Sequence, residues 1–177
     1  MKKNKKWIQL LIFGFVLVIG AFTVFSNLKS ETVKPPKVGD KAIDFTLQGL
    51  DGQTYQFSDI QKGKVIVMNY WGTFCPPCKA EMPALQRQQD KWKDKDVLIL
   101  GMNMDNSRVT AQQFLDELNL NLFSLHDEKD VVRKQYGVKD YPTTFFIGRD
   151  GKIKEIRVGE MDEPYIDRMI SQIVQGG

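Results

Sequence analysis

The feature that most constrains the fold is Cys75-Pro76-Pro77-Cys78, which follows an apolar run over residues 65–70. These are the two cysteines of the chain. The run predicts a strand buried on both faces, and a proline after the first cysteine is typical of the first turn of a helix. Two cysteines separated by two residues, between a strand and a helix, indicate a redox pair in an α/β fold.

The rest of the chain alternates strand and helix patterns. This alternation indicates a central sheet with parallel strands and with helices on both faces. A hairpin near the end adds antiparallel strands, so we expect a mixed sheet. The expected elements are a hairpin over residues 43–57, a helix from Pro76 that is interrupted at Pro83, a strand at 97–102, a helix at 109–118, a strand at 123–125, a helix at 130–136, a hairpin at 143–147 and 153–158, and a final helix capped by Asp162.

The N-terminal segment has the pattern of a membrane anchor. Lysines stand at positions 2, 3, 5 and 6, and residues 7–25 are nearly all apolar. A bilayer is spanned by about 20 apolar residues in a helix, and lysines before the span place its start in the cytoplasm. The alternative is a cleaved signal peptide. Both interpretations deliver the rest of the chain outside the cytoplasm, where disulfides persist.

We therefore divide the chain into three segments. Residues 1–25 carry cytoplasmic lysines and the anchor or signal peptide, residues 26–37 form a linker, and residues 38–177 form the folded domain. The expected location is the cell membrane, crossed once, with the domain on the extracytoplasmic side. Four of the 25 basic residues of the chain are these N-terminal lysines, and the remaining 21 nearly balance its 22 acidic residues. The domain therefore lacks the basic character that nucleic-acid binding requires.

The order of the two cysteines predicts their roles. A thiolate at the start of a helix is stabilised by the helix dipole and by free N–H groups, so Cys75 is expected to be the exposed nucleophile. Cys78 is expected to be more buried and to resolve the mixed disulfide. Because Pro76 and Pro77 have no N–H, the nearest backbone donor for Cys75 is that of Cys78. This favours a less stabilised thiolate and a reductant.

Other uses of the cysteine pair fit less well. A structural disulfide that closes so short a loop would constrain little. Zinc needs four ligands, and the chain offers only His126 besides the cysteines, so no metal is expected. Lys79 follows Cys78, which excludes the Cys-x-x-Cys-His haem-attachment motif. Thiol chemistry needs no further cofactor, and none is expected.

The block from Asn69 to Pro83, Asn-Tyr-Trp-Gly-Thr-Phe-Cys-Pro-Pro-Cys-Lys-Ala-Glu-Met-Pro, resembles the active-site block of the TlpA/ResA-like thiol-disulfide oxidoreductases. These are membrane-anchored members of the thioredoxin superfamily, and the resemblance extends over residues 38–175. It implies a thioredoxin-like three-layer α/β fold with a central mixed sheet and an N-terminal β-hairpin extension, behind an N-terminal transmembrane helix.

The resemblance also implies site residues. Pro142 matches the cis-proline that faces the disulfide, and the backbone beside it receives the substrate chain in strand-like pairing. Glu81 matches an acid that influences thiol ionisation, while Asn69 stands where cytoplasmic thioredoxins carry a buried aspartate. A solvated helix charge is the alternative interpretation of Glu81. The expected substrate-binding residues are Trp71, Pro76, Tyr141, Pro142 and Thr143.

Two residues depart from the family pattern. Phe74 stands where a tryptophan is usual, and Pro76 replaces the glutamate of the best-known ResA-like proteins. The reduction potential and the substrate of those proteins therefore do not transfer to this chain. Cys-Pro-Pro-Cys occurs in family members, including a StoA-like protein implicated in endospore formation.

The expected function is reduction of disulfides in partner proteins outside the cytoplasm. The resemblance implies apocytochrome c or a spore or envelope protein as substrate, with electrons from an integral-membrane thiol carrier. One alternative is a thiol oxidase that introduces disulfides into secreted proteins. A copper metallochaperone shares the fold but uses Cys-x-x-x-Cys with a suitably placed histidine. The peroxiredoxin signature Pro-x-x-x-Thr-x-x-Cys fails at both Cys75 and Cys78.

Overall fold

Residues 3–28 and 34–176 are described in the computed structural model, and side chains are described for residues 7–21 and 34–176. The chain divides into two units, Met1–Val33 and Lys34–Gly177. The expected segments at 1–25, 26–37 and 38–177 stay a prediction, and residues 29–33 of the expected linker lie outside the described residues.

The first unit holds a single described helix, α1 (Lys3–Leu28). The predicted anchor over residues 7–25 falls inside this helix, but the side chains of residues 22–25 lie outside the described residues. In the part of the chain that the structure describes, no helix combines the length and the apolarity that a membrane crossing requires. The transmembrane helix therefore stays a prediction.

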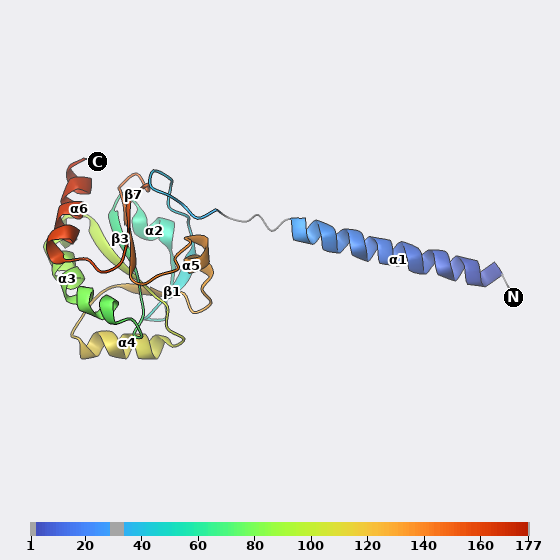
Figure 1. Ribbon diagram of the computed structural model, residues 1–177, viewed down its shortest axis with the longest axis horizontal. Coiled ribbons are helices and arrows are strands. Elements are labelled where there is room, and N and C mark those ends of the chain that lie inside the picture. Colours follow the sequence, from blue (N-terminus) through green and yellow to red (C-terminus); the bar gives the residue numbers. More distant parts are fainter. Residues whose placement is uncertain (1–2, 29–33, 177) are drawn as a thin grey trace. The chain divides into compact units, whose positions relative to one another are not determined.

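The second unit, drawn in Figure 1, is built on a seven-stranded sheet. The order of its strands is β2-β1-β5-β4-β3-β6-β7. Strands β3, β4 and β5 are parallel, while β6, β7 and the β1–β2 pair run antiparallel to their neighbours. The expected mixed sheet is confirmed. The strands are β1 (Thr46–Gly49), β2 (Thr54–Gln56), β3 (Val65–Trp71), β4 (Val97–Asn103), β5 (Ser124–His126), β6 (Thr143–Ile147) and β7 (Ile153–Val158).

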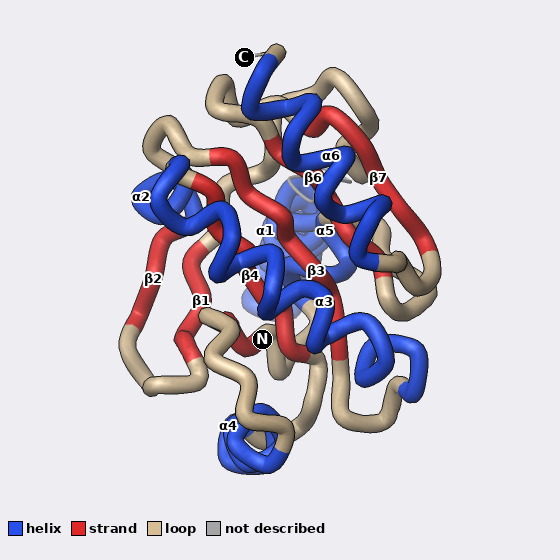
Figure 2. The backbone as a smooth tube through the Cα atoms, turned by 90° about the vertical axis from the view of Figure 1, so that its left-hand side faces the viewer, coloured by secondary structure: helices blue, strands red, loops and turns tan. Residues whose placement is uncertain are grey.

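Helices cover both faces of the sheet, because alternate side chains of the buried strands point to opposite faces. Val65 and Val67 of β3 pack with α3 (Pro76–Trp92) and α6 (Glu163–Gln175). Ile66 and Met68 pack on the other face with α2 (Phe57–Gln61) and α5 (Val131–Gln135). Figure 2 shows α3 and α6 in front of the strands. The three-layer arrangement is thereby confirmed.

The terminal parts of the domain also follow the predictions. The N-terminal hairpin forms from β1 and β2 and extends the sheet beside β5, although its first strand begins at Thr46 rather than at residue 43. The side chain of Asp162 accepts a hydrogen bond of 2.8 Å from the backbone N–H of Tyr165 and caps α6. The helix α4 (Arg108–Glu117) and the short 3₁₀ helix η1 (Lys93–Lys95) complete the domain.

Candidate active site

The two cysteines form a disulfide at the N-terminus of α3, with their Cα atoms 5.3 Å apart. Cys75 is the N-cap of this helix, and its Sγ accepts a hydrogen bond of 3.3 Å from the backbone N–H of Cys78. Pro76 and Pro77 occupy the first helical positions and have no N–H to donate. The donor that the sequence predicts for Cys75 is thereby confirmed.

The disulfide is less accessible than the sequence suggests. Cys75 is 6% exposed and Cys78 is fully buried, so their order of exposure is as expected. The expectation of an exposed Cys75 is wrong for this disulfide form, because the apolar side chains of α3 and α4 enclose the cysteines. In this apolar cluster the two cysteines pack with Met82 of α3, with Ala111 and Leu115 of α4, and also with Trp71 of β3.

Glu81 is buried, with only 1% of its surface exposed. Its Oε1 accepts a hydrogen bond of 2.8 Å from Asn69 Nδ2, and its Oε2 accepts one of 2.9 Å from the backbone N–H of Met161. The interpretation of Glu81 as a solvated helix charge is therefore wrong. The cause is its position on α3, where it faces the end of the sheet instead of solvent.

Burial raises the pKa of Glu81 to about 7, because it penalises the charged carboxylate. The hydrogen bonds from Asn69 and from the N–H of Met161 oppose this shift, and the nearby charge of Glu160 adds to it. Glu81 follows Cys78 by three residues on the same helix, so the two lie on one helix face. The site therefore holds, on the face that carries Cys78, a group that exchanges a proton near neutral pH.

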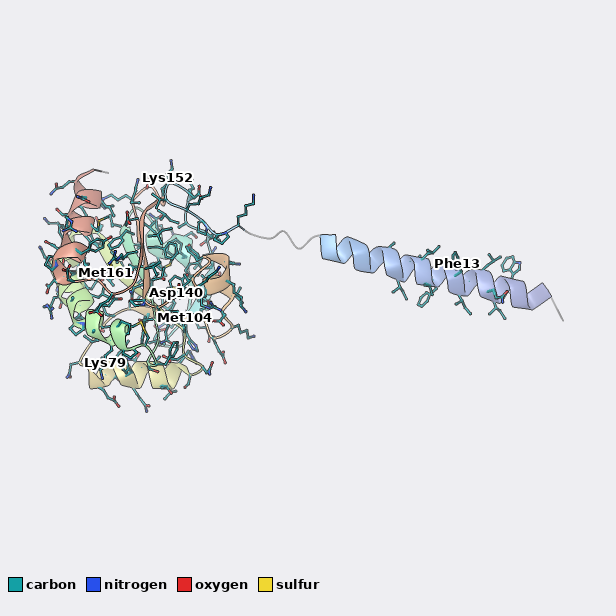
Figure 3. All side chains as sticks on the ribbon, viewed as in Figure 1. Phe13, Lys79, Met104, Asp140, Lys152 and Met161 are labelled. Atoms are coloured by element: carbon teal, nitrogen blue, oxygen red, sulfur yellow. A yellow bond between two sulfur atoms is a disulfide. The ribbon has the colours of Figure 1, made fainter. Side chains whose placement is uncertain are left out.

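The peptide bond between Tyr141 and Pro142 is cis, as predicted. The carbonyl oxygen of Pro142 accepts a hydrogen bond of 2.8 Å from the N–H of Gly159, and Thr143 Oγ1 donates one of 2.7 Å to the carbonyl of Asp140. Asp140, labelled in Figure 3, marks the loop that leads into this bond. Internal contacts thus hold the segment on both sides of the cis bond.

The expected substrate-binding residues differ in exposure. Pro76 is exposed and Tyr141 is half-buried, while Pro142 and Thr143 are buried. Trp71 is 1% exposed, so it lies inside the protein instead of at the surface of a groove. Its ring stacks on Phe114, with the centroids 5.9 Å apart, and α4 thereby covers the indole.

Phe74, next to Cys75, is the most exposed aromatic ring near the disulfide, at 59%. It makes an edge-to-face contact of 5.7 Å with Tyr141. Phe74 and Pro76, both exposed, stand on either side of Cys75 in the chain and present apolar surface beside it.

Sequence reasoning missed the polar residues that hold the loop before Cys75. The carboxylate of Asp105 accepts hydrogen bonds from the backbone N–H and the hydroxyl of Thr73. Asn103 is the last residue of the buried strand β4 and Asp105 follows it, and the carboxyl ends of parallel strands meet at the same edge of a sheet. Polar residues directly after a predicted parallel strand were the signal that could have found them.

His126 is a structural residue in this arrangement. Its Nε2 lies 2.6 Å from the carbonyl oxygen of Asp105. Within the described residues, no three His, Cys, Asp or Glu side chains gather in a metal-binding group.

The fold and the disulfide at the start of α3 define a thioredoxin-like thiol-disulfide oxidoreductase. The model of the AhpC/TSA family matches residues 38–156. The thiol-disulfide oxidoreductase ResA of Oceanobacillus iheyensis is 34% identical over 176 residues, which cover 97% of this chain and 91% of that relative. The ResA protein of Halalkalibacterium halodurans is 29% identical over 172 residues, which cover 97% of each chain.

The chain is also similar to proteins whose structures have been solved. The crystal structure of a thiol:disulfide interchange protein DsbE from Chlorobium tepidum is similar with a TM-score of 0.73 and 31% identity, over 78% of this chain and 99% of that one. StoA of Bacillus subtilis is similar in fold, with a TM-score of 0.63 and 22% identity, over 72% of this chain and 96% of that one. The chain belongs to the AhpC/TSA family and, within it, to the ResA-type thiol-disulfide oxidoreductases.

Proposed function

We propose that this oxidoreductase is held in the cell membrane by residues 7–25 and reduces disulfides in partner proteins on the extracytoplasmic side. The observation that carries the direction is that, among residues 34–176, the one backbone donor to Cys75 Sγ is the N–H of Cys78. A thiolate with few donors is less stabilised, so the dithiol gives up its electrons more readily.

The proposed reaction is a two-step exchange. The Cys75 thiolate attacks one sulfur of the partner disulfide, forms a mixed disulfide and releases the other sulfur as a thiolate. The Cys78 thiolate then attacks Cys75 Sγ and releases the second sulfur of the partner. The Cys75–Cys78 disulfide is restored, and two electrons have passed to the partner. An integral-membrane thiol donor returns two electrons for the next cycle.

Glu81 is proposed to take the proton of the Cys78 thiol before the second step. Its pKa of about 7 suits a group that accepts and returns a proton at neutral pH. Its place three residues after Cys78 on α3 supports this role.

The substrate site is proposed to lie over Pro76 and Tyr141, with the backbone of residues 141–143 pairing with an extended segment of the partner. The exposed ring of Phe74 supports an apolar contact with the partner beside Cys75. Trp71, Pro142 and Thr143 are buried, so their proposed role is to support the residues that contact the partner. The resemblance to TlpA/ResA-like proteins supports apocytochrome c, or a spore or envelope protein, as the partner.

The exchange is tested by trapping. We expect the variant Cys78→Ala to retain its partner as a mixed disulfide on Cys75, because the resolving sulfur is missing. The complex should be recovered from an envelope extract under non-reducing conditions and disappear with dithiothreitol. The matched control, Cys75→Ala, should trap nothing. Equal recovery of partners with both variants, or with neither, would contradict the exchange.

The direction is tested by the reduction potential in glutathione buffers. A reductant is expected to have a potential close to that of thioredoxin, about −270 mV. A potential near that of the strong oxidant DsbA, about −120 mV, would overturn the proposal and support the oxidase alternative.

A further inference from the structure

A buried carboxylate is bound to the loop that carries the nucleophile. Asp105 Oδ1 accepts a hydrogen bond of 2.7 Å from Thr73 Oγ1, and both carboxylate oxygens lie 3.2 Å from the backbone N of Thr73. Thr73 lies two residues before Cys75, inside a turn closed by the hydrogen bond of 3.1 Å from the N–H of Cys75 to the carbonyl of Gly72. The carboxylate therefore holds the centre of this turn.

The same carboxylate is fixed from the strands behind it. Asn103 Nδ2 donates a hydrogen bond of 2.6 Å to Asp105 Oδ2, and the N–H of Asp105 donates one of 3.1 Å to Asn103 Oδ1. His126 of β5 contacts the carbonyl of Asp105 at 2.6 Å. Met104, labelled in Figure 3, marks this end of β4, and its N–H donates to the carbonyl of Trp71 at 3.0 Å.

Asp105 is only 7% exposed, so its charge is weakly screened by solvent. In its hydrogen bonds with Thr73 and with Asn103 Nδ2, the carboxylate of Asp105 is the acceptor each time. No cation pairs with Asp105 among the described residues, whose ion pairs all involve other acids.

We propose that Asp105 is a positioning residue that docks the Gly72–Cys75 turn through Thr73 and tunes the Cys75–Cys78 couple toward reduction of its partners. The docking keeps the N–H and hydroxyl of Thr73 turned to Asp105, so neither is available to stabilise a thiolate on Cys75. The negative charge behind the turn further opposes a second negative charge on Cys75. Both effects destabilise the dithiol form relative to the disulfide.

This inference rests on thiol-disulfide exchange at Cys75 and Cys78, and it holds for either physiological direction of electron flow. Its test is the equilibrium in which the oxidised protein and two glutathiones give the dithiol protein and one glutathione disulfide. A second readout is the rate at which iodoacetamide alkylates Cys75 at neutral pH in the reduced protein.

Asp105→Asn removes the charge and keeps the shape of the side chain. We expect it to shift the glutathione equilibrium toward the dithiol by at least about threefold, and to raise the alkylation rate, because the thiolate gains stability. The matched control is Asp127→Asn, another buried carboxylate at the end of a parallel strand, which accepts hydrogen bonds from α5 and none from the turn. It should stay within about twofold of the wild type.

A second pair of variants keeps the test decisive if Asp105→Asn does not fold. Thr73→Val removes the hydroxyl that docks the turn and leaves the charge, so only the docking effect is lost and the equilibrium should move toward the dithiol by at least about twofold. Thr73→Ser retains the hydroxyl and should match the wild type. A role in stability alone would not shift this equilibrium toward the dithiol in Asp105→Asn and Thr73→Val while leaving it unchanged in Thr73→Ser.

Two results would overturn the inference. One is a shift in Asp105→Asn no larger than that in Asp127→Asn, and the other is a Thr73→Val variant that matches Thr73→Ser. Failure of the exchange reaction itself would look different, because then even the wild-type protein would not equilibrate with glutathione.

Discussion

At the level of single residues, the pKa of Glu81 depends on the groups that surround its carboxylate. Asn69 donates one amide hydrogen to Glu81 and the other to Thr144, so it links α3 to β3 and β6. Asparagine is neutral and its amide nitrogen only donates, so it can contact either protonation state of Glu81 without adding a charge. The proton therefore belongs to Glu81 alone, and its pKa is set by burial.

This arrangement makes a prediction about pH and stability. The folded pKa of Glu81, about 7, lies above the ordinary value of 4.5, so the folded protein keeps a proton that the unfolded chain has lost. Stability should therefore be greatest below pH 4.5 for this group and decrease as the pH rises through 7, by on the order of 3 kcal/mol. Urea unfolding of the oxidised protein across this range measures the slope.

Glu81→Gln should abolish that decrease, because glutamine does not titrate. The matched control is Glu117→Gln on the exposed side of α4, which should retain it. An unchanged slope in Glu81→Gln would assign the pH dependence to other groups.

At the element scale, the close pairing of β3, β4 and β5 places the indole of Trp71 over Gly101. A Cβ atom on Gly101 would overlap Ser124 Oγ and would lie 2.8 Å from Trp71 Nε1. Glycine is thus required by the close approach of three strands, not by an unusual backbone angle. The bare backbone of β4 lets Trp71 lie beneath the cysteines.

We expect Gly101→Ala to lower the free energy of unfolding by about 1–3 kcal/mol, because the neighbouring side chains must shift to admit a methyl group. Chemical denaturation measures the loss. Adding Ser124→Ala to this variant should recover part of it, since the nearest atom is then removed, and Ser124→Ala alone serves as the control. A Gly101→Ala protein as stable as the wild type would show that β4 has room for a side chain.

At the scale of the whole molecule, the chain consists of two units, for which we propose separate tasks. The unit Lys34–Gly177 contains the sheet, both cysteines and Glu81, so every residue of the proposed chemistry lies in it. The unit Met1–Val33 is proposed to supply only the attachment to the membrane.

This separation predicts the behaviour of a truncated protein. The fragment 34–177 should fold, stay in the soluble fraction and reduce a disulfide substrate with a rate within about twofold of the full chain, because its core is complete. The full chain should sediment with the membranes and resist extraction by high salt. Recovery of the full chain in the soluble fraction would contradict the anchor, while an inactive fragment would contradict the separation of tasks.

The helices and strands, and the order in which they occur, could be predicted from the amino-acid sequence. Apolar runs such as residues 65–70 fix a buried strand through side-chain hydrophobicity alone, and Asp150-Gly151 fixes a hairpin through local backbone geometry. The spacing of Cys75 and Cys78 likewise identifies a redox pair, because two cysteines three positions apart can form a disulfide without contacts to distant segments. The cis bond before Pro142 came from the resemblance to a family, not from local physics.

The surroundings of those residues could not be predicted in this way, because they depend on the three-dimensional fold. Whether Trp71 meets solvent, whether Glu81 is charged, and which carboxylate holds Thr73 all depend on contacts between segments far apart in the chain. Burial is a property of three dimensions, and the desolvation that raises the pKa of Glu81 has no counterpart in its sequence neighbours. The sequence therefore identified the reacting sulfur atoms, while the packing of α3, β4 and the loop at Met161 set the environment in which they react.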